Sequence, residues 1–247
     1  MRPPFALILP AAGKSTRFGG KEKKPFVNID GRAIWLRAAE AFVTRPEVKQ
    51  CFIVVAPEDM EVFKRRFSAN VMFMNIQIVE GGSERFESVA NALARVAQEI
   101  EFVAIHDAVR PCVPPPMIDR VFDAAIQSGA ALPGLAVSDT LKRAGNEMKV
   151  DATITRAGLW MAQTPQTFRK DLLIEAYAKR TSLGNAVTDD AQLVEALGHA
   201  VRLVPGSPFN LKVTTQDDLS IAELFAKHRK WEPPVKTSRP FEDERFS

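Results

Sequence analysis

The 247-residue sequence lacks the features of several special protein classes. It has only two cysteines, Cys51 and Cys112, too few for the disulfide framework of a small secreted domain, and we expect both to be unreactive thiols. No apolar run approaches the roughly 18 residues that a membrane-spanning helix requires, so no membrane partner is expected. The apolar segment 5–9 is also too short for the core of a signal peptide. These absences predict a cytoplasmic protein.

The chain also lacks a strong charge of one sign. Its 33 Lys and Arg residues against 30 Asp and Glu residues give a net charge of +3, so we expect no nucleic-acid partner. The 46% apolar and 26% charged residues are typical of a globular protein with an ample core. Residues 1–230 are predicted to form a single domain. Residues 231–247, rich in charge and without periodicity, are predicted to be a disordered tail.

Apolar segments of strand length alternate with segments of helical periodicity along most of the chain. The predicted strands are 7–10, 51–56, 71–79, 102–105, 130–137, 201–204 and 211–214, and the predicted helices are 32–44, 58–67, 84–100, 115–128, 170–181, 189–198 and 217–230. This alternation predicts an α/β fold with a Rossmann-like, doubly wound, largely parallel sheet that binds ligands at the carboxyl ends of its strands. Segment 138–155 breaks the alternation and is predicted to form two strands around a turn.

The most informative segment follows the first predicted strand. Small residues occupy the sequence Ala11-Ala12-Gly13, and cations then gather at Lys14, Arg17, Lys21, Lys23 and Lys24. Small residues let backbone N–H groups approach an anion closely, and the cations neutralise it. The segment therefore predicts a phosphate-bearing ligand, most simply a nucleoside triphosphate.

Gly13-Lys14-Ser15 matches the end of a Walker A loop, but the surrounding sequence does not fit that motif. Ile8 stands where the motif requires its first Gly. A helix should also begin directly after the Lys-Ser pair, whereas the segment 17–25 contains Gly-Gly and Pro. The P-loop interpretation therefore fails.

A second interpretation accounts for more of the chain. The run Pro10-Ala-Ala-Gly-x-x-x-Arg17, with Lys24 seven residues further on, resembles the signature of the sugar- and polyol-phosphate nucleotidyltransferases. The later segments that strengthen the resemblance are Gly81-Gly-Ser-Glu-Arg85-x-x-Ser88, His106-Asp107-Ala-Val-Arg110-Pro111, Thr164-Pro165-Gln166 and Asn210-Leu-Lys212-Val-Thr214. Together, over residues 5–225, they are similar to the 2-C-methyl-D-erythritol 4-phosphate cytidylyltransferase family.

The resemblance implies a fold of the nucleotide-diphospho-sugar transferase type and transfer of CMP from CTP to a polyol phosphate, with release of pyrophosphate, in isoprenoid precursor synthesis. It also implies a homodimer in which the arm at 138–155 completes the active site of the neighbouring subunit. Two alternatives stay open at this point. One is a ribitol 5-phosphate cytidylyltransferase, and the other is a catalytically weak paralogue that binds nucleotide.

This reaction is an in-line attack by a phosphate oxygen on the α-phosphorus of the triphosphate. Because the attacking phosphate is already ionised, no general base is required, and catalysis rests on positioning and on stabilisation of the added negative charge. The resemblance assigns that stabilisation to Arg17 and Lys24. It assigns the orientation of the attacking phosphate to Arg156, which suits bidentate contacts, and to Lys212, which acts as a point charge.

The sequence departs from the family pattern beside these cations. The family's Pro-Lys-Gln is Lys23-Lys24-Pro25 here. The seven-residue spacing selects Lys24, and Pro25 is expected to hold Lys24 extended, but Lys23 stays an alternative. Ser15 stands where the family usually has a second Gly, so the loop is expected to follow a slightly different path near the β-phosphate.

The remaining site predictions fall into three groups. The predicted CTP-binding residues are Pro10, Ala11, Ala12, Gly13, Lys14, Ser15 and Thr16 around the triphosphate, and Gly82, Ser83 and Ser88 around the base. The predicted polyol-phosphate contacts are Arg110, Thr140, Arg156, Thr164 and Lys212. Asp107, which follows an apolar strand, is the candidate ligand for Mg²⁺, since a hard carboxylate oxygen suits that ion. We interpret the pair Asp189-Asp190 as a helix cap and assign no chemistry to His106.

Overall fold

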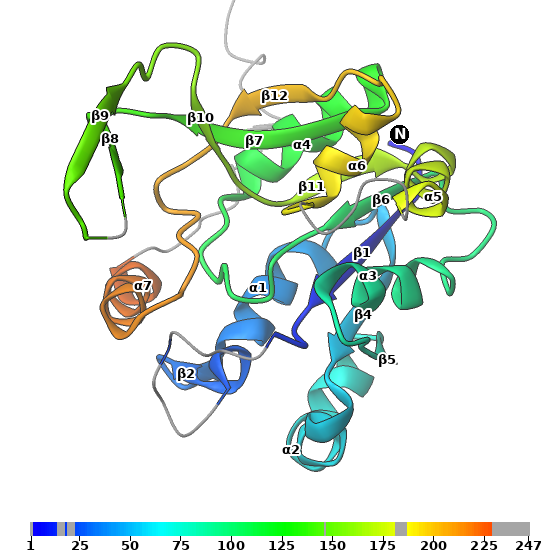
Figure 1. Ribbon diagram of the computed structural model, residues 1–247. Helices are drawn as coiled ribbons and strands as arrows, with labels where there is room; N and C mark the ends of the chain where they lie inside the picture. The colour runs from blue at the N-terminus through cyan, green and yellow to red at the C-terminus, as the bar shows by residue number, and fades with distance from the viewer. Residues whose placement is uncertain (1, 14–17, 19–22, 146, 181–186, 229–247) are drawn as a thin grey trace, which may run out of the picture.

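The computed structural model describes residues 2–13, 18, 23–145, 147–180 and 187–228. Within them a single large sheet is formed by β1 (Phe5–Pro10), β4 (Val48–Val55), β5 (Ile76–Glu80), β6 (Phe102–Ile105), β7 (Ala130–Ala136), β10 (Trp160–Ala162), β11 (Gln166–Arg169) and β12 (Arg202–Pro205). The strand order is β10-β7-β11-β6-β1-β4-β5, with β12 beside β7 (Figure 1). The strands β6, β1, β4 and β5 are parallel, as is the pair β12–β7, whereas β10 and β11 are antiparallel to their neighbours. The prediction of a mostly parallel α/β sheet is confirmed.

Helices cover both faces of this sheet. Successive side chains of a strand point to opposite faces, so Phe5, Leu7 and Leu9 of β1 pack on one side and Ala6 and Ile8 on the other. The first face is covered by α1 (Ile34–Val43), α2 (Met60–Phe73) and α4 (Pro115–Ser128), and the second by α3 (Arg85–Leu93), α5 (Lys170–Ala178) and α6 (Asp190–Ala196). The result is the doubly wound, three-layer arrangement that the sequence predicts.

A smaller unit lies beside these layers. The helix α7 (Gln216–His228) packs against the short strand β2 (Asn28–Ile29) through a separate apolar cluster that includes Phe18, Ile29 and Ala222. The strand β2 pairs antiparallel with β3 (Arg32–Ala33). Two 3-10 helices, η1 (Lys24–Phe26) and η2 (Pro57–Asp59), follow the loops after β1 and β4. Both stand near the carboxyl ends of the parallel strands.

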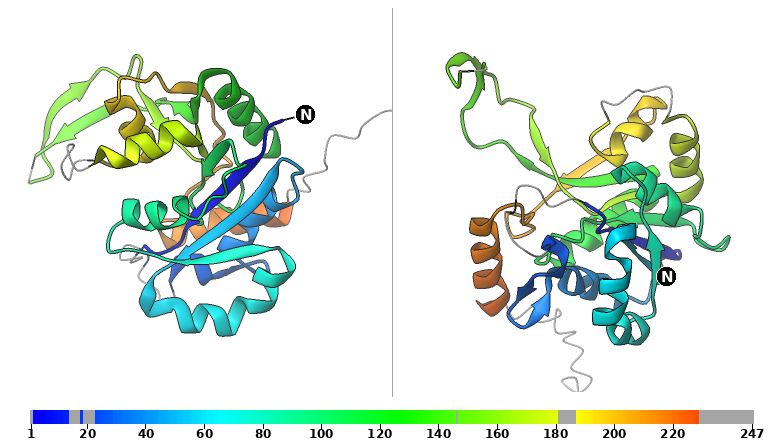
Figure 2. Two further views of the ribbon diagram at one scale, coloured as in Figure 1. Left: turned by 90° about the vertical axis from the view of Figure 1, so that its right-hand side faces the viewer. Right: turned by 60° about the horizontal axis from the view of Figure 1, so that its bottom comes forward.

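The predicted pair of strands in segment 138–155 is present as β8 (Leu141–Ala144) and β9 (Val150–Ile154), which pair antiparallel with each other. Most side chains of the hairpin are exposed. The hairpin stands away from the body of the molecule in every view (Figures 1 and 2).

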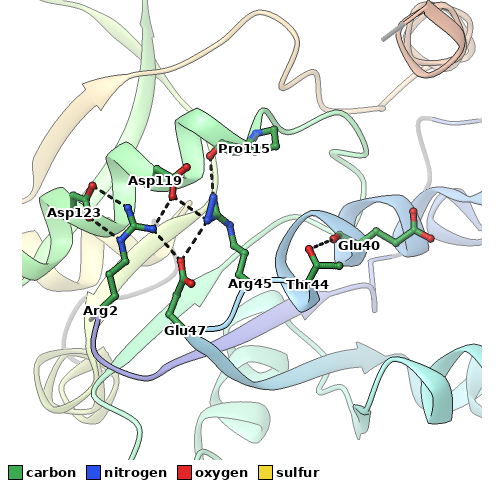
Figure 3. A network of polar contacts seen from close by, with 8 residues as sticks. All are labelled: Arg2, Glu40, Thr44, Arg45, Glu47, Pro115, Asp119 and Asp123. Atoms are coloured by element: carbon green, nitrogen blue, oxygen red, sulfur yellow. Dashed lines mark hydrogen bonds and ion pairs between the residues drawn. The ribbon is translucent and has the colours of Figure 1, made fainter. Parts of the chain in front are cut away.

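A network of ion pairs connects the start of the chain to α4 (Figure 3). Arg2 donates to Glu47 and Asp119 through Nη1, at 3.0 and 2.6 Å, and its Nε contacts Asp123 at 2.8 Å. Arg45 contacts the same Glu47 and Asp119. The network lies at the amino end of β1, so it stabilises the end of the sheet opposite to the carboxyl ends where ligands are expected.

Several predicted boundaries are wrong. The strand predicted at 71–79 is divided, because α2 continues to Phe73 and β5 begins only at Ile76. Asn75, with φ 51°, adopts the left-handed conformation that often ends a helix. The helix predicted at 84–100 ends at Leu93, and the strand predicted at 211–214 is irregular backbone. The strands β10 and β11 were not predicted, and the predicted tail at 231–247 lies outside the described residues.

Candidate active site

A cleft of about 710 Å³ opens at the carboxyl ends of the parallel strands β6, β1, β4 and β5. Its lining comes from the segments that directly follow these strands and from two more distant loops. The lining residues used below are Pro10, Ala11, Ala12, Gly13, Lys24, Glu58, Gly82, Ser83, Arg85, Ser88, Asp107 and Lys212. Ten of the eighteen sequence-predicted site residues therefore meet at one cleft, as the geometry of a parallel sheet requires.

The loops after β1 and β5 approach each other across the cleft wall. A Cβ atom on Gly81 would lie 2.8 Å from Cβ of Ala12 and 2.9 Å from Oγ of Ser88, so only Gly allows this contact. The backbone N–H of Gly81 donates to the carbonyl oxygen of Val55 at 2.8 Å and extends the β4–β5 pairing into the loop. Because the residues of both loops are small, their backbones lie close together and form this wall of the cleft.

The loop before α3 is held in shape by its own side chains. Ser88 Oγ accepts from the N–H of Gly82 and donates to the carbonyl oxygen of Glu84, both at 3.1 Å. Glu87 accepts from the backbone and hydroxyl of Ser83, each at 2.7 Å, and forms a capping box with Glu84. These hydrogen bonds lower the pKa of the Glu87 carboxyl. Ser88 therefore shapes the wall as well as lining it.

Asp107 is the buried carboxylate at the base of the cleft. Its Oδ2 lies 3.1 Å from Nε of Arg110 and 3.1 Å from Nζ of Lys212. Burial alone would raise the pKa of the Asp107 carboxyl, but the nearby charges of Lys212, Arg110 and Arg85 outweigh it and hold the pKa well below its usual range. Asp107 is thus ionised throughout the neutral range.

Behind Asp107 lies a group of buried polar side chains. Thr164 Oγ1 accepts from the N–H of Asp107 at 3.0 Å and lies 3.1 Å from Nδ1 of His106. His106 Nε2 lies 3.2 Å from the carbonyl oxygen of Arg110. Burial lowers the pKa of His106 to about 4, so the imidazole is neutral at pH 7. Asn210 donates to the carbonyl oxygen of Thr164 at 2.7 Å.

The two neighbouring lysines of the first loop have different environments. Lys23 Nζ contacts Glu58 at 2.9 Å and Asp59 at 2.5 Å. Lys24 lines the cleft. The expectation that Pro25 holds Lys24 extended is wrong: Lys23 has the extended backbone, with φ −66° and ψ 135°, and Lys24 is the first residue of η1. Carbonyl oxygens of both lysines accept from Phe26 and Val27 in that short helix, and these bonds outweigh the preference of a residue before Pro.

Sequence reasoning missed a second charged group in the cleft wall. Arg85 Nη2 lies 2.7 Å from Oδ2 of Asp190, whose other oxygen accepts from the hydroxyl of Tyr177 at 2.6 Å. Asp189 is the helix cap, as predicted, since its carboxylate accepts from the N–H of Gln192. Asp190, in contrast, is fully buried and is no cap. The only feature of the sequence that could have placed Arg85 in the cleft wall was its position beside the Gly-Gly-Ser segment.

The other predicted residues lie outside the cleft. Arg110 and Thr164 are buried behind Asp107, with 8% and 5% of their surface exposed. Thr140 and Arg156 flank the projecting hairpin and are exposed, and Arg156 donates to the carbonyl oxygen of Ser138. The positions 14–17, which include Lys14, Ser15, Thr16 and Arg17, lie outside the described residues.

A possible metal site depends mostly on Asp107. Among the residues that the structure describes, no group of three or more His, Cys, Asp or Glu side chains could hold a metal ion. The single ionised carboxylate of Asp107 in the cleft suits Mg²⁺, which is commonly bound by one or two carboxylates together with substrate phosphates and water.

Comparisons with known proteins show which family this chain is similar to. The model of a family described as 2-C-methyl-D-erythritol 4-phosphate cytidylyltransferase matches residues 5–228. A protein of that name from Solibacter usitatus is 38% identical over 232 residues, which cover 90% of this chain and 95% of the relative. Another from Rhodopirellula baltica is 41% identical over 231 residues, covering 89% and 93%.

Solved structures show the same likeness. The crystal structure of 4-diphosphocytidyl-2C-methyl-D-erythritol synthase from Anaerococcus prevotii has a TM-score of 0.77 and 27% identity, and the match covers 91% of this chain and 96% of that one. The 2-C-methyl-D-erythritol 4-phosphate cytidylyltransferase from Thermus thermophilus has a TM-score of 0.74 and 31% identity, with 92% and 100% covered.

Proposed function

The chain belongs to the 2-C-methyl-D-erythritol 4-phosphate cytidylyltransferase family, and we propose that the cleft at the carboxyl ends of β6, β1, β4 and β5 is its active site. The enzyme transfers CMP from CTP to 2-C-methyl-D-erythritol 4-phosphate and releases pyrophosphate, a step in isoprenoid biosynthesis. The observation that carries the site assignment is that the cleft brings the loops after β1 and β5 together with Asp107 and Lys212.

CTP would lie along the wall formed by the small residues. The triphosphate would lie against Ala11, Ala12 and Gly13, which admit close approach of backbone N–H groups. The base would lie against Gly82, Ser83 and Ser88, whose loop is already shaped by internal hydrogen bonds. A preformed wall reduces the entropy that is lost when the nucleotide binds.

The chemical step joins two anions and needs no proton transfer. An oxygen of the acceptor phosphate forms a bond to the α-phosphorus, the bond from that phosphorus to the bridging oxygen breaks, and pyrophosphate leaves with the electron pair. Lys24, at the cleft, and Arg17 would stabilise the negative charge that builds up on the α-phosphoryl oxygens. Lys212, beside Asp107, would hold the acceptor phosphate in line for attack.

A divalent cation would be held by Asp107. Mg²⁺ bound there would neutralise phosphate charge and so favour the departure of pyrophosphate. The protein's own contribution is an ionised carboxylate in the cleft, which Lys212 and Arg110 keep deprotonated. Removal of divalent cations with EDTA should abolish activity, and added Mg²⁺ should restore it. Full activity in EDTA would exclude this role.

We place Thr140 and Arg156 in the site of a second copy of the chain. Both flank the projecting hairpin and neither lines the cleft of its own chain, so a homodimer would bring them to the partner's acceptor phosphate. Mixing two weakly active variants, Lys212→Ala and Arg156→Ala, tests this arrangement. If Arg156 acts across the dimer, each mixed dimer has one complete site and activity returns on subunit exchange. If it acts within its own chain, mixing restores nothing.

Substrate choice is tested by measuring pyrophosphate release with CTP, ATP, GTP and UTP, each against 2-C-methyl-D-erythritol 4-phosphate and ribitol 5-phosphate. The expected result is release with CTP and the methylerythritol substrate at a kcat/KM at least about a hundredfold above the other pairs. A preference for ribitol 5-phosphate would favour the alternative cytidylyltransferase. No release with any pair would indicate the weak, nucleotide-binding paralogue.

A cytoplasmic location is part of this proposal. Cys51 is a free, buried thiol whose pKa is raised by burial, which suits a reducing compartment. Among the described residues no helix is long and apolar enough to cross a membrane. Recovery of the enzyme in the membrane or extracellular fraction of cells would contradict this location.

A further inference from the structure

His106 and Thr164 have a hydrogen-bond arrangement that permits only one placement of their protons. The carbonyl oxygen of Arg110 can only accept, so His106 Nε2, at 3.2 Å, must carry the ring proton. His106 Nδ1 is then an acceptor, and Thr164 must donate its hydroxyl proton to it at 3.1 Å. The lone pairs of the Thr164 oxygen remain available to accept from the N–H of Asp107 at 3.0 Å.

We propose that His106 and Thr164 are positioning residues that fix Asp107 in the cleft. Thr164 is 5% exposed and His106 is fully buried, so neither is placed to touch a substrate. Both act on the turn at 106–110, which they hold from two sides. Thr164 accepts from the backbone N–H of Asp107, and His106 donates to the carbonyl oxygen of Arg110. Within the same turn, the N–H of Arg110 donates to the carbonyl oxygen of Asp107 at 3.0 Å.

The arrangement forms a closed circuit. Asp107 Oδ2 accepts from Arg110 Nε, and Arg110 Nη1 donates to the carbonyl oxygen of Asn210 at 2.7 Å. Asn210 donates to the carbonyl oxygen of Thr164 at 2.7 Å. The hydroxyl oxygen of Thr164 accepts from the N–H of Asp107, which closes the circuit. The backbone and the carboxylate of Asp107 are therefore fixed by the same ring of contacts. Lys212 follows Asn210 by two residues, so the circuit also sets the position of the second cleft cation.

This role differs from a direct contact between Thr164 and the acceptor phosphate. A direct contact needs a hydroxyl that faces the cleft, whereas the Thr164 hydroxyl has one donor and one acceptor partner within the protein. The inference rests on the proposed function, because it takes Asp107 to be the working carboxylate. Wild-type enzyme that transfers no CMP would refute the function. An active wild-type enzyme is therefore the reference for the variants, and each test includes an observable other than activity.

The test compares Thr164→Val, which keeps the shape and removes the hydroxyl, with Thr164→Ser, which keeps the hydroxyl. Thr167→Val is the matched control, since Thr167 is also fully buried but its hydroxyl has no hydrogen-bond partner. Thr164→Val should lower kcat by about tenfold or more, with changes of less than about threefold in either KM. Exchange of the Asp107 amide proton should become faster by a similar factor. Thr164→Ser and Thr167→Val should stay near wild type in both measurements.

Two results would overturn the proposal. One is a Thr164→Val enzyme that keeps its kcat, has a raised KM for the polyol phosphate alone and shows unchanged exchange at Asp107, as a direct substrate contact predicts. The other comes from the wild-type protein and does not depend on whether the variants fold. ¹⁵N NMR of the histidine-labelled protein should show the Nε2–H tautomer of His106, and an Nδ1–H tautomer would exclude donation from Thr164.

Discussion

Replacement of Lys24 and Lys23, one at a time, should separate a catalytic cation from a structural one. Lys24 lines the cleft, so Lys24→Ala removes a positive charge that would face the α-phosphoryl group. Loss of one such group typically lowers kcat about a hundredfold, which corresponds to about 2.7 kcal/mol of transition-state stabilisation. Pyrophosphate release at saturating CTP and methylerythritol phosphate measures this directly.

Lys23→Ala should affect the folded state instead. Lys23 Nζ bridges Glu58 and Asp59 at 2.9 and 2.5 Å, and its side chain is 22% exposed. A partly exposed ion pair of this kind contributes about 1 kcal/mol, so the melting temperature should fall by about 2–4 °C. Because the charge is already engaged by two carboxylates, kcat should change less than about tenfold.

Asp59→Asn is the matched control for this pair of variants. It removes the ion pair of Lys23 with Asp59 and leaves the pair with Glu58, and Asp59 does not line the cleft. It should therefore lower the melting temperature by part of the shift of Lys23→Ala and leave kcat near wild type. A larger loss of kcat in Lys23→Ala than in Lys24→Ala would refute the assignment and would move the transition-state cation by one residue.

Three further predictions concern the same cleft. Arg17→Ala should lower kcat by about two to three orders of magnitude, and a variant that keeps more than half of the wild-type kcat would remove Arg17 from the transition state. Lys212→Ala and Arg156→Ala should each raise the KM for the polyol phosphate far more than the KM for CTP, and equal changes in both constants would contradict the acceptor-phosphate role. Without ligand and in EDTA, the free energy of unfolding should fall by up to about 3 kcal/mol between pH 6.5 and 4, because the unfolded state takes up a proton at His106 near pH 6.5 whereas burial holds the folded pKa at about 4. Denaturant melts of wild type and His106→Gln across this range measure it, and equal slopes in the two proteins would disprove the attribution to His106.

The sequence was sufficient to predict which segments line the cleft but not to predict the contacts between their side chains. The alternation of apolar strands and amphipathic helices predicts a parallel sheet, and a parallel sheet gathers the ends of its strands at one edge. For that reason the segments after β1, β5 and β6 could be assigned to a common site before any contact was known. Boundaries were less accurate: the apolar residues at 71–73 fit a strand, yet they form the end of α2, with Phe73 93% exposed.

The partners of the site residues could not be predicted, because they are distant in the sequence. Arg85 and Asp190 are 105 positions apart, and Thr164 and Asp107 are 57 apart. No local periodicity records such a contact. Asp189 and Asp190 illustrate the limit, since adjacent carboxylates at a helix start have the same local signal, but one caps the helix and the other is buried against Arg85 and Tyr177.

Exposure explains which cations of the site are free to bind substrate. Removing one partner of a buried ion pair costs about 3–5 kcal/mol, whereas an exposed pair is worth about 1 kcal/mol or less. Arg110 and Lys212 contact the same oxygen of Asp107, but the Arg110 side chain is 10% exposed and that of Lys212 is 42% exposed. We therefore expect Lys212 to exchange Asp107 for a phosphate at small cost, whereas Arg110 would leave a buried charge behind. On this argument the same carboxylate would hold one cation for structure and one for substrate, a distinction that depends on burial and that residue type alone does not reveal.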